Sequence, residues 1–163
     1  MVEDIDEVED IDLAIVAYLD EDDWYVQELP EEVLESVDAI ARELRRYPAE
    51  TGAVALISVD EDWLLIIRVL GASVRLLLSD ASAATDWALA RSAFVQLGLP
   101  VEDDDEQVPA GDLGIVTDLG TSASELAELL DDFDLYPEEI LSEVATRAGF
   151  GTKFDDVAGL SNA

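Results

Sequence analysis

Three apolar runs separated by very short turns constrain the fold of this chain most. The runs are "GAVALISV" (52–59), "WLLIIRVL" (63–70) and "SVRLLLS" (73–79). Runs of this length that are bounded by turn residues are typical of strands, and such short turns make neighbouring strands antiparallel. The runs are apolar at nearly every position instead of every second one. They therefore predict a sheet whose two faces are both covered, by helices or by a partner.

The Gly71-Ala72 turn predicts the register of the second and third runs. Glycine at the first central position suits a two-residue type II′ hairpin, which places Arg68 opposite Arg75 on one face of the sheet. Like charges directly opposite each other destabilise a sheet. We therefore expect negative charge beside them, from carboxylates elsewhere in the chain or from a bound anion. Asp80 and Asp86, which follow the third run, are candidates.

The order of the remaining elements predicts an α+β fold. Two β-prone runs (13–19 and 24–29) flank the acids "DEDD" and suggest a hairpin, a helix is expected over 31–46, and a shorter helix ends at Gly98. The order β-β-α-β-β-β-α gives a five-stranded, mainly antiparallel sheet followed by C-terminal helices. It is similar to the longin, roadblock and profilin-like group, whose domains usually serve as binding and dimerisation platforms.

Charge and turn residues predict the boundaries along the chain. We expect an acidic disordered arm (1–11), an α+β domain (12–100), an acidic linker (101–111), a helical C-terminal module (112–151) and a frayed tail (152–163). Within the module, Ser122 and Glu125 have capping-box spacing. The helices of this module fit an independent interaction unit and a layer of the main domain equally well.

The net charge of −32 limits the classes of partner. Binding of phosphate backbones or anionic lipid requires Lys or Arg, so neither direct nucleic-acid binding nor membrane binding is expected. A protein partner with a basic surface is expected instead. A homodimer is a second candidate assembly, and solubility alone is the alternative explanation of the charge. There is no secretory signal and no apolar run of ~18 residues, so a cytoplasmic location is expected.

The stretch "SDASAATDW" (79–87) is the candidate site of the sequence. Its acids, with Arg68 and Arg75, could form a salt-bridged corner between a strand and a helix, or a pocket in which the arginines bind a small anion. Asp80 and Asp86 could instead hold Mg²⁺ or Mn²⁺ together with the acids at 60–62, which would make the protein a metal-dependent enzyme. Trp87 is a candidate interface residue. The chain has no His and no Cys, which excludes a Ser-His-Asp triad and thiolate chemistry.

Several stretches of the chain resemble the actinobacterial family of tRNA adenosine deaminase-associated proteins. The most specific are "LLLSDASAATDW" (76–87) and "DLYPEE" (134–139), and the resemblance extends over 12–29, 52–69 and 109–151. It implies an accessory role with the tRNA adenosine deaminase as a candidate partner. Deaminase chemistry itself needs a zinc ion held by His and Cys. This chain has neither, so it is not the deaminase itself. We expect a non-enzymatic protein without cofactor or metal.

Overall fold

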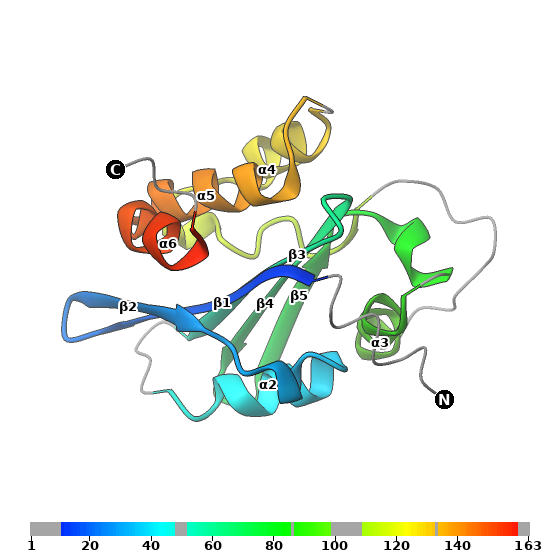
Figure 1. The fold of residues 1–163 in the computed structure, drawn as a ribbon, viewed down its shortest axis with the longest axis horizontal. Coiled ribbons are helices and arrows are strands. Elements are labelled where there is room, and N and C mark those ends of the chain that lie inside the picture. The colour runs from blue at the N-terminus through cyan, green and yellow to red at the C-terminus, as the bar shows by residue number, and fades with distance from the viewer. Residues whose placement is uncertain (1–10, 48–51, 86, 99–108, 133, 160–163) are drawn as a thin grey trace.

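The protein is a sheet between two helical layers (Figure 1). The computed structural model describes residues 11–47, 52–85, 87–98, 109–132 and 134–159. The antiparallel sheet has six strands in the order β2-β1-β3-β4-β5-β6. The strands are β1 (Ile11–Asp20), β2 (Asp23–Glu28), β3 (Ala53–Val59), β4 (Trp63–Leu70), β5 (Ser73–Leu78) and β6 (Ala110–Gly111). The α-helices are α2 (Val37–Leu44), α3 (Ala88–Leu97), α4 (Ala123–Leu130), α5 (Pro137–Ala148) and α6 (Gly151–Ala158).

The β4–β5 hairpin has the register that the Gly71-Ala72 turn predicts. Arg68 pairs with Arg75 across the two strands. Gly71 has a φ of 61°, which glycine adopts at no steric cost and which a type II′ turn requires at this position. The predicted pairing of two arginines on one face is therefore confirmed.

Both faces of the sheet are buried, as the two-sided apolar strands predict. Alternate strand residues such as Ile57, Trp63 and Leu65 pack with α2 and α3. Their neighbours, such as Leu56 and Leu64, pack with the C-terminal helices. Figure 1 shows α2 and α3 on one side of the sheet and α4, α5 and α6 on the other. The C-terminal helices thus cover the second face of the sheet and share its core.

The prediction of five strands is wrong, because the sheet has a sixth. β6 pairs Ala110 with Leu78 and Gly111 with Leu77, inside the segment predicted to be a linker. Two residues, one of them a glycine, leave no alternating pattern from which a strand could be predicted. The described residues bear out the rest of the predicted order of strands and helices.

Two helix predictions also need correction. The helix expected over 31–46 begins only at Val37, because the Ser36 hydroxyl accepts a hydrogen bond from the Ala39 N–H at 3.1 Å and caps it. Glu31–Val33 form a separate 3₁₀ turn. The tail expected to fray forms α6, because Phe154 is fully buried against the second face of the sheet.

Some predicted segments lie outside the described residues. These are residues 1–10 of the arm, 101–108 of the linker, and Asp86. The division into a main domain and a helical module stays a prediction. Among the described helices, none is long and apolar enough to cross a bilayer.

Candidate functional site

Arg68 is neutralised by a carboxylate from the segment that follows β6. Its guanidinium donates to both oxygens of Asp118, at 2.6 and 2.8 Å, and to the Ile115 carbonyl at 2.9 Å. The Arg68 side chain is 6% exposed and that of Asp118 is 56% exposed. The hydrogen bonds from Arg68 lower the pKa of Asp118. This bidentate pair fixes the segment before α4 to the face of the sheet.

Arg75 has its own carboxylate partner. Its Nε donates a hydrogen bond to Asp112 Oδ2 at 2.7 Å, and its Nη2 lies 2.6 Å from the same oxygen in a salt bridge. Nη2 donates a hydrogen bond to the Gly114 carbonyl at 3.1 Å. Both side chains of this pair are nearly half exposed. The predicted need for negative charge beside the two arginines is therefore met within the chain, by Asp112 and Asp118.

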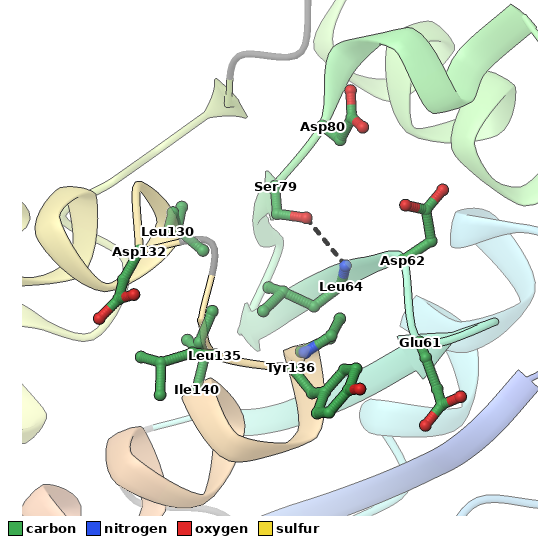
Figure 2. A pocket seen from close by; sticks show the side chains of 11 residues that line it. Glu61, Asp62, Leu64, Ser79, Asp80, Leu130, Asp132, Leu135, Tyr136 and Ile140 are labelled. Carbon is green, nitrogen blue, oxygen red and sulfur yellow. Dashed lines mark hydrogen bonds between the residues drawn. The ribbon is translucent and has the colours of Figure 1, made fainter.

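Asp80 is used differently from the expectation that it compensates the arginines. Its Oδ1 accepts hydrogen bonds from the Ser82 N–H at 2.9 Å and the Ser82 hydroxyl at 2.6 Å, which begins the 3₁₀ turn after β5. Ser79 Oγ accepts a hydrogen bond from the Leu64 N–H at 2.9 Å (Figure 2). Both side chains thus shape the corner between β5 and the turn.

Trp87 lies at the start of α3 and packs against the core. It is partly buried, and its ring centroid lies 6.0 Å from that of the fully buried Trp63 in an edge-on arrangement. Asp86, the remaining candidate of this stretch, is outside the described residues.

The corner opens into an acidic pocket between the sheet and the C-terminal helices. The pocket has a volume of about 260 Å³. Its carboxylates come from the β3–β4 turn (Glu61 and Asp62), from the end of β5 (Asp80) and from the end of α4 (Asp132). Figure 2 shows Asp62 and Asp80 on one side and Asp132 on the other. The remaining lining residues are Leu64, Ser79, Leu130, Leu135, Tyr136, Pro137 and Ile140.

The acids at this end of the sheet repel one another. Partial burial raises the pKa of Asp62, and the charges of Asp80 and Asp60 raise it further. Burial likewise raises the pKa of Glu138, and Asp12 and Glu61 add to the effect. The raised pKa values mean that burial, together with neighbouring negative charge, disfavours the ionised form of these two carboxyl groups.

The ion pairs of the described residues lie outside the acidic pocket. They join Arg42 to Asp38, Arg46 to Glu43, Arg68 to Asp118, Arg75 to Asp112, and Arg147 to Glu125 and Glu143. None of these pairs includes a carboxylate of the pocket. The paired arginines stabilise helices and loops, and the ion pairs among the described residues leave the pocket carboxylates without a basic partner.

The carboxylates do not form a metal site within the part of the chain that the structure describes. No group of three or more Asp or Glu residues there is placed to hold a metal ion. The pocket therefore presents separate carboxylates along its walls. This arrangement suits hydrogen bonding to an extended cationic group better than the coordination of one ion.

Comparison with known proteins places the chain in a family. Residues 12–151 match the model of the Rv3753c-like tRNA adenosine deaminase-associated proteins. The chain is also 30% identical, over 148 residues, to Protein Rv3753c of Mycobacterium tuberculosis (strain ATCC 25618 / H37Rv). The aligned residues make up 88% of this chain and 86% of the relative. The chain belongs to the Rv3753c-like tRNA adenosine deaminase-associated protein family. No solved structure matches it.

The family match confirms the resemblance found from the sequence. It includes both arginine–aspartate pairs and the acidic pocket, since all of these residues lie within 12–151. The sequence alone did not identify Asp112, Asp118 or Asp132. The arginine register predicted that negative charge was needed, but Asp118 lies 50 residues from Arg68 and only the tertiary fold brings them together.

Proposed function

We propose that this protein is a non-catalytic accessory protein that binds a protein with a cationic surface, and that the partner is the tRNA adenosine deaminase. The family description supports the choice of partner, because it names its members as associated with that enzyme. The net charge of −32 supports the class of partner, because opposite fields accelerate association. The absence of His and Cys from the sequence agrees with a role that is not deamination.

The observation on which the proposal rests is the unneutralised acidic pocket. Its apolar wall, formed by residues such as Leu64, Leu130 and Ile140, suits the methylene groups of a long side chain, and its carboxylates suit a terminal charge. A Lys or Arg of the partner matches both features. Burial is the main cause of the raised pKa of Asp62, and insertion of such a side chain would offset the repulsion from Asp80 and Asp60 that adds to it.

An enzyme that binds tRNA must present cationic groups to the phosphate backbone. The accessory protein would use the same electrostatic attraction, so it would compete with tRNA for that surface or hold the enzyme until tRNA displaces it. We further propose that the fold is of the longin, roadblock and profilin-like group, that it can form homodimers through a sheet edge or a helix, and that it acts in the cytoplasm.

Co-elution of the purified full chain with the purified deaminase in size-exclusion chromatography tests the proposal. We expect a complex at about 50 mM salt and its dissociation at about 500 mM, where the Debye length falls to a few ångströms. The double variant D62N/D80N should weaken the complex by about tenfold. The control E31Q/E32Q removes the same charge from an exposed 3₁₀ turn before α2 and should change it little. Separate elution of the wild-type proteins at low salt would refute the proposal.

A further inference from the structure

The end of the β1–β2 hairpin projects beyond the rest of the sheet. β1 pairs with β3 only as far as Ala17, whereas it pairs with β2 as far as Asp20. The last three residues of β1 and the first three of β2 therefore form a two-stranded ribbon, which Figure 1 shows extending past the neighbouring strands. An isolated ribbon of this kind is marginally stable, so its side chains must be supported from elsewhere.

One face of the ribbon is covered by the C-terminal helices. The ring of Trp24 lies 4.5 Å from that of Phe150, centroid to centroid. Lys153 Nζ donates a hydrogen bond to the Trp24 carbonyl at 2.7 Å. The C-terminal helices therefore cover this face and contact part of the outer edge of β2.

The opposite face of the ribbon has an aromatic surface. Tyr18 and Tyr25 are cross-strand neighbours whose rings stack at 5.3 Å with an interplanar angle of 19°. The ring of Tyr47, which follows α2, lies 5.0 Å from that of Tyr18. Tyr25 is 45% exposed, which makes it one of the few large apolar side chains that the described residues present to solvent.

Hydrogen bonds hold this aromatic surface in place. The Tyr47 hydroxyl donates to Glu43 Oε2 at 3.1 Å and accepts from Gln27 Nε2 at 3.1 Å. Glu43 is in turn paired with Arg46. The polar atoms around Tyr47 are therefore satisfied, and the exposed ring of Tyr25 is presented on a fixed support.

Asp20 and Asp23 lie next to the tyrosines on the same face, because alternate strand residues point the same way. They are directly opposite each other in the hairpin, which is the same like-charge conflict that Arg68 and Arg75 have. Both of those arginines have carboxylate partners. By contrast, the ion pairs among the described residues include neither Asp20 nor Asp23.

We propose that the Tyr25 ring, together with Asp20 and Asp23, binds an arginine side chain of the cationic partner. A guanidinium group can stack flat on a tyrosine ring and donate in-plane hydrogen bonds to carboxylates at the same time. A lysine ammonium has no planar face to stack and no paired donors. The proposal rests on the proposed function for the cationic nature of the partner, and it adds a second contact that selects arginine over lysine.

Binding of labelled hexa-arginine and hexa-lysine peptides to the full chain, followed by fluorescence anisotropy at about 150 mM salt, tests this proposal. We expect the arginine peptide to bind several-fold more tightly than the lysine peptide. Tyr25→Ser should weaken arginine-peptide binding about two- to five-fold and leave lysine-peptide binding nearly unchanged. Tyr25→Phe keeps the ring and should retain binding. Val95→Ser is the control, because Val95 is 80% exposed on α3 and lines neither the hairpin nor the acidic pocket.

The charges are tested with D20N/D23N against D62N/D80N, which remove equal charge from the hairpin and from the pocket. The hairpin variant should abolish the preference for arginine, and the pocket variant should keep it. Equal binding of the two peptides by wild type, equal effects of Tyr25→Ser and Val95→Ser, or an arginine preference that survives in D20N/D23N would each overturn the inference. None of these results would affect the complex with the deaminase, whose absence would refute the proposed function instead.

Discussion

Replacement of Asp118 by Asn should destabilise the fold markedly, because it removes the carboxylate that the buried Arg68 guanidinium binds through two hydrogen bonds. The Arg68 side chain is 6% exposed and donates twice to Asp118. Removal of one partner of a fully buried ion pair costs about 3–5 kcal/mol. Asp118 is more than half exposed, so water can partly replace it. We therefore expect a loss of about 2 kcal/mol in the free energy of unfolding.

Asp112→Asn is the matched control. It breaks the pair of Arg75, the cross-strand neighbour of Arg68, but both side chains of that pair are over 40% exposed. Exposed pairs contribute at most about 1 kcal/mol, and Asn can still accept the hydrogen bond that Asp112 Oδ1 accepts from the Gly114 N–H. Equilibrium denaturation of the full-length variants by urea measures both losses.

The pH dependence of the free energy of unfolding gives a second measure of the Arg68–Asp118 pair. The pKa of Asp118 is lower in the folded chain than its ordinary value. The stability it contributes is therefore present at neutral pH and is lost as the pH falls through the folded pKa. In an Arg68→Met background, Asp118→Asn should change the free energy of unfolding very little, because the pair is already absent. Equal losses for D118N and D112N, or a full D118N loss in the Arg68→Met background, would refute the reasoning.

Three further predictions concern a cap, a turn and the pocket. Ser36→Ala should lower the free energy of unfolding by about 1 kcal/mol, because it removes the hydroxyl that accepts a hydrogen bond from the Ala39 N–H at the start of α2. An unchanged midpoint of thermal unfolding would contradict this. Gly71→Ala should lower the free energy of unfolding by about 1 kcal/mol. The cause is backbone strain alone, since φ is 61° and a Cβ there would meet no atom within 4 Å. An unchanged free energy of unfolding in denaturant would show that the turn is not strained. Asp62→Asn should stabilise the chain at neutral pH, because its pKa is raised in the fold and its ionised form opposes folding. That gain should vanish in acid, where wild-type Asp62 is protonated, and a variant less stable than wild type at pH 7 would exclude repulsion in the pocket.

The local parts of the fold could be predicted from the sequence because short-range rules determine them. The Gly71-Ala72 turn determines its hairpin register, and the Ser122–Glu125 capping box begins α4 as predicted. Gly98 and Gly149 end their helices in left-handed conformations. Each of these features depends on residues within a few positions of one another.

The long-range parts could not be predicted in the same way. The carboxylates that neutralise Arg68 and Arg75 come from the segment after β6, which lies at the sheet because β6 pairs with β5, and no sequence pattern predicts that pairing. The apolar spacing continues on both sides of Ser36, so the sequence pattern does not mark Ser36 as the start of a helix. The acidic pocket joins the β3–β4 turn, the end of β5 and the α4–α5 connection, and no sequence pattern links these segments.

Titration calorimetry of the purified full chain with the purified tRNA adenosine deaminase tests the central claim most directly. The account predicts stoichiometric binding at about 50 mM salt, at least tenfold weaker binding at about 500 mM, and competition by added tRNA. Heats indistinguishable from dilution at low salt, or an affinity that neither salt nor tRNA changes, would contradict an acidic accessory protein that binds the cationic surface of the enzyme.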